Sequence, residues 1–282
     1  MTKRMIDADT GEIIEVSSYR TPEQDKAYRE IKKKETAKNR ADNPFIFTEM
    51  NIGGLEVLNN KDLGYYLILQ TYIDYKNMIK STTDSNLPMT REQMQEVLKI
   101  SSNKTLVNLV KRFKKQGLLY EEKVGLYGKQ HKAFFIADKY CFRKGISGDS
   151  RKRKTDKAVK VFMSSLQEVY AQGDFKPADI GFIYKVIPFV HYDSNYLVKN
   201  PNERDYSKAE YLTIDDLAQV QGLSRQKTAQ KLTNLVYDNK YVFARTKVGN
   251  IKELRVKANP FVVYRKAGEP KALGFEFYVN PE

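Results

Sequence analysis

Two stretches of the chain are apolar on nearly every side, and they align with each other without a gap. They are residues 62–75 (DLGYYLILQTYIDY) and residues 179–192 (DIGFIYKVIPFVHY). A helix that is apolar all round is generally buried. Both stretches therefore predict a largely buried helix, and Pro188 is expected to kink or end the second one.

A pair of amphipathic helices is predicted after each buried stretch. The first helix of the pair begins at Thr90 and again at Thr213, because a threonine followed by glutamine or acids is suited to cap a helix. The second helix is predicted from about Ser102 to Lys115 and from Arg225 to about Asp238. Its apolar positions recur every three or four residues, as in a packed face: Leu106, Leu109, Val110 and Phe113, and then Ala229, Leu232, Leu235 and Val236.

A β-hairpin is predicted after each helix pair. Lys123-Val-Gly125 and Lys247-Val-Gly249 lie between strand-like runs, which cover 118–124 and 132–137 in the first copy and 241–248 and 251–257 in the second. The two copies also end alike, at 140–145 (YCFRKG) and 263–268 (VYRKAG). Patterns that recur in the same order indicate an internal duplication.

The repeated order is buried helix, short strand, helix, tight turn, helix and hairpin, which is typical of a winged helix-turn-helix. We therefore predict a mainly α fold with small β wings (α+β), made of two tandem winged helix-turn-helix domains from an internal duplication. The predicted parts are a charged N-terminal arm at 1–44, winged-helix domain 1 at 45–147, a basic linker at 148–159 and winged-helix domain 2 at 160–282. Within the arm, residues 7–15 suggest a small hairpin that turns at Thr10-Gly11.

Composition points to a polyanionic partner. The 282 residues carry a formal net charge of +14, and the pI is near 9.5. A basic field of this size favours nucleic acid as the partner. The hydrophobic fraction of 41% supports packed cores. No apolar run approaches the length of a membrane span and no signal peptide is found, so we expect a cytoplasmic protein that contacts no membrane.

The outward side chains of the second helix in each pair are of types that bind base edges or phosphate. No acid occurs from Ser101 to Tyr120 or from Ser224 to Tyr237. The predicted DNA contacts are Ser102, Asn103, Lys104, Asn108 and Lys111 on the first such helix; Ser224, Arg225, Gln226, Lys227, Gln230 and Lys231 on the second; Lys129, Lys132, Lys247 and Lys252 in the hairpins; and Arg151, Lys152, Arg153 and Lys154 in the linker. The alternatives are faces that are merely solvated, or faces that contact protein only.

The two copies are expected to contribute unequally. The second helix of the second copy offers long side chains that can make bidentate contacts with bases, among them Arg225 and Gln226. The first copy is richer in lysines suited to phosphate. We therefore expect the second copy to recognise more of the DNA sequence.

No pattern of an active site is found. The two histidines, His131 and His191, belong to no ligand cluster or triad, and no P-loop or dinucleotide fingerprint occurs. Cys141 is the single cysteine and has apolar neighbours, which predicts a buried, inert thiol and excludes an intramolecular disulfide. We expect a protein that is not an enzyme and needs neither cofactor nor metal.

Two segments carry a resemblance to known proteins. Residues 223–235 (LSRQKTAQKLTNL) resemble the recognition helix of many bacterial winged-helix regulators, and residues 257–268 (KANPFVVYRKAG) resemble the ending of winged-helix plasmid and phage replication proteins of Firmicutes. The resemblance implies a mobile-element origin and a replication or regulatory role. The duplicated second helix predicts that one chain binds double-stranded DNA at two half-sites, and we expect a role in replication initiation. The alternatives are a phage or plasmid transcription regulator, and an adaptor that binds a protein such as a polymerase. Contacts with the replication or transcription machinery, and an oligomer, are compatible with each of these.

Overall fold

The protein is described here by a computed structural model of residues 1–282. The structure describes residues 3–6, 11, 13–16, 44–55, 57–80, 86–143, 157–247, 254–266 and 268–279. The chain divides into two compact units, Met1–Asp42 and Asn43–Glu282. In the first unit, strands β1 (Lys3–Ile6) and β2 (Ile13–Val16) form an antiparallel hairpin in which Lys3 pairs with Val16.

The second unit holds the helices and strands that follow. Its α-helices are α2 (Asn60–Gln70), α3 (Arg91–Val97), α4 (Asn103–Lys115), α6 (Met163–Gln172), α7 (Pro177–Val186), α8 (Ile214–Gln221) and α9 (Arg225–Asn234), with 3₁₀ helices at Ile187–Phe189, Tyr206–Lys208 and Phe275–Phe277. Its strands are β3 (Phe45–Glu49), β4 (Leu119–Leu126), β5 (Lys129–Ile136), β6 (Cys141–Phe142), β7 (Ala158–Phe162), β8 (Val236–Tyr237), β9 (Lys240–Tyr241), β10 (Phe243–Thr246), β11 (Arg255–Ala258) and β12 (Val263–Tyr264). We call residues 44–143 the first half of this unit and residues 157–279 the second half.

A four-stranded antiparallel sheet joins the two halves. Its strand order is β12-β7-β3-β6, so the strands at its centre come from different halves. Phe45 of β3 pairs with Phe162 of β7, and Phe47 pairs with Lys160. Ile46, Val159 and Val161 are fully buried there. The sheet is therefore a single structure to which both halves contribute two strands each.

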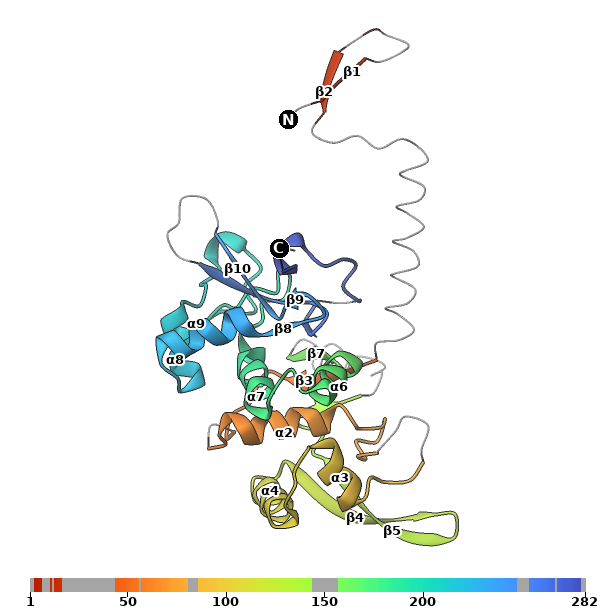
Figure 1. Ribbon diagram of the computed structural model, residues 1–282. Helices are drawn as coiled ribbons and strands as arrows, with labels where there is room; N and C mark the ends of the chain where they lie inside the picture. The colour runs from red at the N-terminus through yellow and green to blue at the C-terminus, as the bar shows by residue number, and fades with distance from the viewer. Residues whose placement is uncertain are drawn as a thin grey trace. The chain divides into compact units, whose positions relative to one another are not determined.

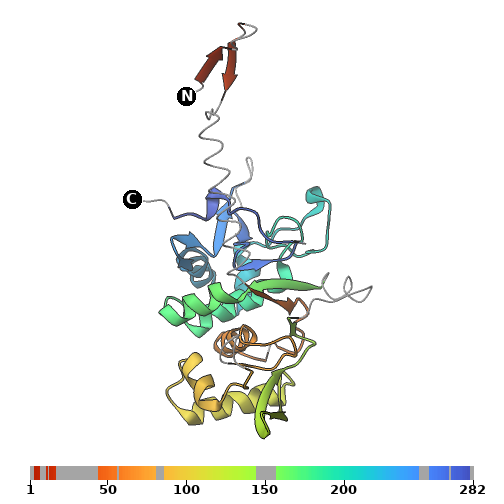
Figure 2. The same cartoon turned by 90° about the vertical axis from the view of Figure 1, so that its right-hand side faces the viewer.

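The helices α2 and α7 also join the halves, and they lie side by side in the middle of the unit (Figure 1). Their N-terminal turns cross at two glycines. A Cβ added at Gly64 would overlap the backbone carbonyl of Pro177, and one added at Gly181 would overlap the backbone carbonyl of Asn60. Only glycine permits backbones to approach this closely. The helix pairs α3–α4 and α8–α9 lie on either side of this crossing (Figures 1 and 2).

The expected mainly α fold with two tandem winged helix-turn-helix domains is wrong. The described residues form an α+β fold in which seven α-helices accompany five small antiparallel sheets. The halves share one hydrophobic core, and α6 of the second half packs on the first half. Tyr170 donates its hydroxyl proton to the carbonyl of Leu98 (2.6 Å), and Gln167 Nε2 donates to the carbonyl of Thr71 (2.9 Å). Two independent tandem domains would lack such shared elements.

Equivalent contacts nevertheless recur in the two halves. Asn77 and Asn195 both adopt a left-handed backbone, with φ of 63° and 59°, which asparagine tolerates better than most residues. The Nδ2 of Asn77 donates to the carbonyls of Ile136 and Cys141, and that of Asn195 donates to Ala258 and Val263. Each asparagine thereby fastens the turn after the buried helix to the strands that end its half.

The turn itself is held by a different residue type in each half. Asp74 Oδ1 accepts from the backbone N–H of Lys76 (2.8 Å) and of Met78 (2.9 Å). His191 stands at the matching position, and its Nδ1 accepts from the backbone N–H of Asp193 (3.3 Å). His191 Nε2 lies 2.6 Å from the carbonyl oxygen of Glu203, and the side chain is fully buried. His191 is thus a structural residue that replaces a carboxylate acceptor.

Several predicted boundaries shift. α9 ends at Asn234 rather than near Asp238, because Leu235 takes an extended backbone and the chain enters β8 at Val236. Asp238 and Asn239 then take left-handed φ angles and turn the chain from β8 into β9. In the first hairpin the turn lies at Tyr127-Gly128, not at Gly125, which pairs with Gln130 inside the ladder. Asn and Asp at left-handed positions are a common hairpin-turn signal.

Candidate nucleic-acid interface

Helix α4 presents one apolar and one polar face. Its apolar face (Leu106, Leu109, Val110 and Phe113) is buried in the core, as the spacing predicts. The opposite face places every predicted contact of this helix in solvent: Ser102, Asn103, Lys104, Asn108 and Lys111 are all exposed. Ser102 is the N-cap residue and makes no side-chain capping bond. The hydroxyl and the amide groups of this face are therefore directed outward.

An ion pair fixes α4 against α2. Arg112 donates from Nε to Asp62 Oδ2 (2.7 Å) and from Nη2 to Asp62 Oδ1 (2.8 Å), a bidentate arrangement. Asp62 lies in the first turn of α2, where a negative charge also complements the helix dipole. The hydrogen bond with Asp62 raises the pKa of Arg112. Arg112 is thus committed to the fold, while Lys104 and Lys111 remain at the surface.

Helix α9 presents a comparable polar face in the second half. Ser224 is its N-cap, and its Oγ accepts from the backbone N–H of Lys227 (3.3 Å). The predicted contacts that are exposed on this helix are Ser224, Arg225, Gln226, Lys227 and Gln230. Lys231 differs because it is only half-exposed and forms an ion pair with Asp179 in the first turn of α7. Lys231 thus performs for α9 the structural task that Arg112 performs for α4.

A second ion pair in this half lies at the surface. Arg225, the first residue of α9, contacts Asp215 of α8 through its Nη1, and the two side chains are 69% and 62% exposed. An exposed pair of this kind is worth about 0.2–1 kcal/mol. A ligand can therefore also contact the Arg225 guanidinium, because both side chains remain accessible. The local pattern marks Asp215 only as a first-turn acid of α8 and gives no sign of this pair, because its two partners lie on different helices.

The first hairpin, β4–β5, carries cations and an aromatic tip. Lys129 and Lys132 are exposed as expected, and Lys132 pairs across the strands with the equally exposed Lys123. Like charges directly opposite each other are destabilising unless an anion lies between them. Tyr127 at the turn is 74% exposed. The base of the hairpin is tied to α4 by the Lys114–Glu121 ion pair at 2.5 Å.

The remaining predicted contacts divide into two groups. Lys247 is exposed directly after β10, and Arg245 of β10, which the sequence analysis did not single out, is exposed beside it. Lys252 and the linker residues Arg151, Lys152, Arg153 and Lys154 lie outside the described residues. The candidate interface among the described residues therefore consists of α4, α9, the β4–β5 hairpin and the end of β10.

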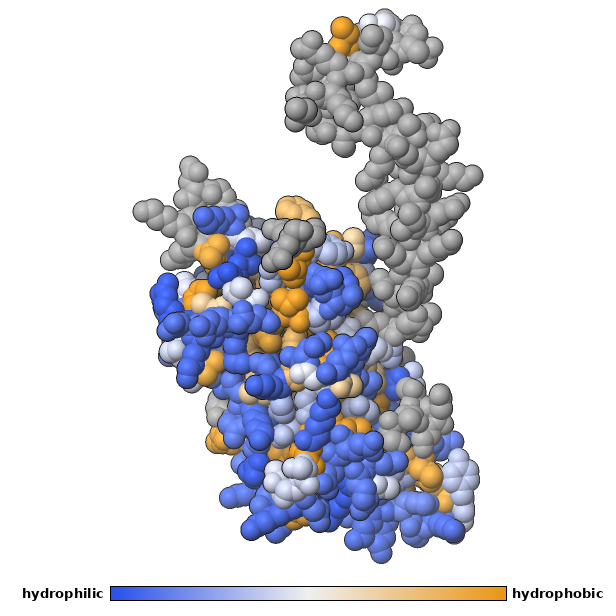
Figure 3. All heavy atoms as spheres, in the orientation of Figure 1, coloured by the Kyte–Doolittle hydropathy of each residue, from blue (hydrophilic) through white to orange (hydrophobic). Residues whose placement is uncertain are grey.

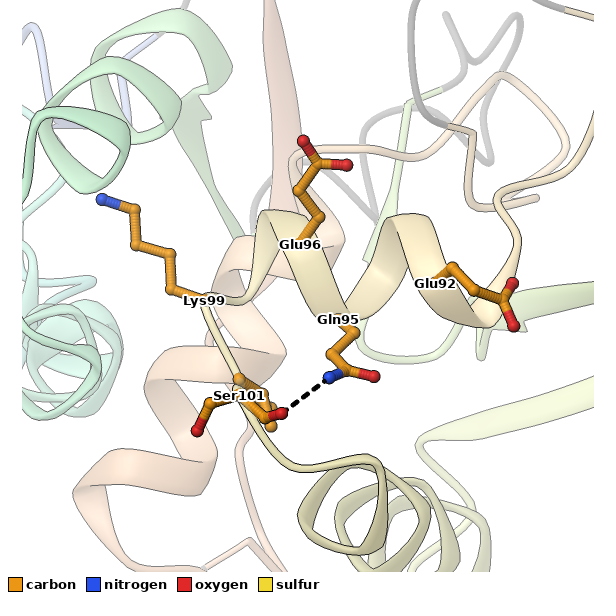
Figure 4. Close-up of a pocket in the computed structure, with 6 residues that line it drawn as sticks. Glu92, Gln95, Glu96, Lys99 and Ser101 are labelled. Atoms are coloured by element: carbon orange, nitrogen blue, oxygen red, sulfur yellow. Dashed lines mark hydrogen bonds between the residues drawn. The ribbon is translucent and has the colours of Figure 1, made fainter.

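The turn between α3 and α4 forms a shallow hollow (Figure 4). Gln95 Nε2 donates to the carbonyl of Ser101 across it (3.1 Å), while Lys99 extends away and donates to the carbonyl of Ala171 of α6 (2.7 Å). Glu92 and Glu96 line the same hollow, so its charge opposes an anionic ligand. The hollow lies beside the start of α4, and its two carboxylates disfavour phosphate there.

The face of the unit that contains α4, α8 and α9 is mainly hydrophilic (Figure 3). α4 and α9 emerge on opposite sides of the α2–α7 crossing (Figures 1 and 2). This arrangement places two separate polar surfaces on one chain. It suits an extended ligand with two sites better than a single compact ligand.

Other chemistry was sought in the same residues. Among the described residues, no group of three or more His, Cys, Asp or Glu side chains is placed to hold a metal ion. Cys141 is fully buried, and burial raises the pKa of its thiol well above the ordinary value. Within the described part of the chain, no helix has both the length and the apolar character that crossing a membrane requires.

Comparisons with protein-family models, with curated proteins and with solved structures give no match to this chain. The function is therefore inferred from the geometry of the surface and from the resemblance of the short sequence motifs.

Proposed function

We propose that this chain binds double-stranded DNA through the exposed faces of α4 and α9. One observation carries the proposal. The second helix of each helix pair presents amide, hydroxyl and cationic side chains to solvent and holds no acid of its own. Asn, Gln and Arg are the types that bind base edges in the major groove, while Lys binds phosphate. One chain would thus cover two half-sites.

The two faces differ in what they offer the ligand. α4 supplies Lys104 and Lys111, which are suited to phosphate, beside the short amides Asn103 and Asn108. α9 supplies Arg225 and the longer amides, a combination suited to base edges. The resemblance of residues 257–268 to plasmid and phage replication proteins favours a role in replication initiation.

The proposal is tested with the purified full chain and a pool of random 30-base-pair duplexes. The length is about three turns of B-DNA, so it accommodates two half-sites. Wild-type protein is expected to enrich a defined sequence. Its affinity for the enriched duplex should fall steeply with salt, because phosphate contacts release counterions. Lys104→Ala combined with Lys111→Ala should reduce the salt slope by roughly one unit per lysine.

The control removes the same charge elsewhere. Lys76 and Lys271 are exposed and belong to none of the helices and hairpins of the interface. Lys76→Ala combined with Lys271→Ala is expected to leave both the affinity and the salt slope close to wild-type. Equal losses in the two double variants would mean that α4 is no special surface. Failure of the wild-type chain to enrich any duplex would refute the proposed function.

A further inference from the structure

Asp215 is an acid on a surface that we assign to a polyanion. It lies in the first turn of α8, where its charge complements the helix dipole. The neighbouring Asp216 carries out the capping of α8: its Oδ2 accepts from the backbone N–H of Thr213 (2.9 Å) and from the hydroxyl of Thr213 (2.8 Å). Asp216 also pairs with Lys199 (2.9 Å). The carboxylate of Asp215 instead contacts Arg225. An acid so placed weakens attraction to phosphate, and its contact with Arg225 couples it to the first side chain of α9.

The contact leaves most of the guanidinium available. Arginine carries five N–H donors in a fixed planar fork, and Asp215 contacts it through Nη1. Among the described residues, the side chain of Arg225 makes no other hydrogen bond or ion pair. A carboxylate at one edge restricts the rotation of the fork while its other donors stay free. Such a fork matches the O6 and N7 acceptors of guanine, where the commonest specific contact is made.

The first half lacks this device. Glu92 stands in α3 where Asp215 stands in α8, as the second residue of the first helix of the pair. The residues that begin α4 are Asn103 and Lys104, and neither forms an ion pair with Glu92 within the described part of the chain. Within the described residues, the acid at this helix position therefore contacts an arginine of the following helix in the second half and not in the first.

We propose that Asp215 is a positioning residue that orients Arg225 to recognise one guanine. This inference rests on the proposed function and specifies the base that α9 recognises. Without the carboxylate, Arg225 is free to swing to the nearest phosphate. Discrimination at that base pair should then fall while attraction to DNA of any sequence rises.

The test uses full-length wild-type protein and the Asp215→Asn variant. Both are exposed to the pool of random 30-base-pair duplexes, and dissociation constants are then measured for the enriched duplex, for each single guanine replacement and for a scrambled duplex. Wild-type protein should prefer guanine at one position by about tenfold. Asp215→Asn should reduce that preference by up to about fivefold, the size of an exposed ion pair, bind the scrambled duplex more tightly and keep its preferences elsewhere. Unchanged thermal unfolding would show that the fold is intact.

Two further variants separate orientation from simple charge. Glu92→Gln removes one negative charge at the matching helix position and should leave the preference for guanine unchanged. In the Arg225→Ala background, Asp215→Asn should have no further effect on that preference, because the aspartate acts only through the arginine. Two results would overturn the inference. One is an equal loss of guanine preference in Glu92→Gln and in Asp215→Asn. The other is a change in guanine preference when Asp215→Asn is added to Arg225→Ala.

The outcome for the proposed function is read separately. If wild-type protein enriches a sequence and Asp215→Asn retains the full guanine preference, only the role of Asp215 is refuted. If wild-type protein enriches no duplex at all, the proposed function fails and this inference fails with it.

Discussion

The two halves of the larger unit solve the same structural problem with different residues. In each half a cation on the second helix pairs with an acid in the first turn of the buried helix: Arg112 with Asp62, and Lys231 with Asp179. In the first half the remaining lysines of α4 are exposed. In the second half the leading arginine of α9 is held by Asp215. Equivalent folding thus coexists with distinct surfaces, and the proposed function assigns these surfaces to different parts of the DNA.

The shared elements set limits on how this comparison is tested. An isolated second half would lose β3 beside β7, and an isolated first half would lose α6 and α7. Each fragment would expose core residues such as Ile46 or Val161, which are fully buried in the intact unit. Experiments on the two halves therefore need substitutions in the complete chain.

The largest effect on the free energy of unfolding is expected from a substitution at the crossing of α2 and α7, which joins the halves. In Gly64→Ala the new methyl group would overlap the backbone carbonyl of Pro177, so α2 and α7 must move apart. We expect a loss of about 3 kcal/mol or more in the free energy of unfolding, measured in urea. Gly222→Ala is the control, because its Cβ meets nothing within 4 Å and only the φ of 65° is unfavourable. It should cost about 1–2 kcal/mol. Equal costs would show that the helices do not depend on the close approach.

A smaller effect on the free energy of unfolding is expected when either ion pair with a buried helix is removed, Arg112–Asp62 or Lys231–Asp179. Arg112→Ala leaves the nearly buried carboxylate of Asp62, whose side chain is 6% exposed, without its bidentate partner. The expected loss is about 2 kcal/mol. Lys231→Ala should cost about 1 kcal/mol or less, since Lys231 offers one ammonium group to a more exposed acid. Arg112→Lys should recover only part of the loss, because lysine cannot make the bidentate contact. A larger loss for Lys231→Ala would reverse the ranking.

If α9 recognises more bases than α4, as proposed, substitutions on the two helices should change DNA binding unequally. Gln226→Ala combined with Gln230→Ala should reduce the preference for the enriched duplex over a scrambled one by about 1–3 kcal/mol. Asn103→Ala combined with Asn108→Ala removes the amides of α4 and should change that preference less. Both measurements use the full chain at one salt concentration. An equal loss in the two variants would indicate that both halves recognise bases alike.

The smallest effect concerns the caps of α3 and α8. Hydrogen bonds from Lys199 and Thr213 lower the pKa of Asp216 to about 2, from an ordinary value of 3.8. A depressed carboxylate pKa stabilises the fold above the ordinary value, and that stabilisation is lost as the pH falls through about 2. The side chain of Asp216 is 24% exposed and its partner Lys199 is 50% exposed, so solvent screens the contact and the contribution is below about 1 kcal/mol. Urea unfolding of wild-type protein and Asp216→Asn should therefore differ at pH 5 and converge toward pH 2.

The first half provides the control for this pH dependence. At the start of α3 the Oε1 of Gln93 accepts from the backbone N–H of the N-cap residue Thr90 (2.9 Å). The amide of glutamine does not titrate. The cost of Gln93→Ala should consequently stay constant between pH 5 and pH 2. A difference between wild-type and Asp216→Asn that stays constant over the same range would contradict the assigned role of Asp216.

The sequence by itself determined the local elements and the faces of α4 and α9. The spacing of Leu106, Leu109, Val110 and Phe113 fixes which side of α4 is buried, because a helix period of 3.6 residues depends on the local chain alone. The capping residues Thr90 and Thr213 mark helix starts for the same reason. The exposed candidate contacts follow from these local rules.

Only the tertiary structure decided how the halves combine and which cations remain available. β3 and β7 are short strands that pair across more than one hundred residues, and long-range pairing leaves little trace in a local pattern. The acids that hold Arg112, Lys231 and Arg225 come from other helices. An acid-free stretch of sequence therefore does not guarantee a free cationic surface, because charges from distant segments meet it only after folding.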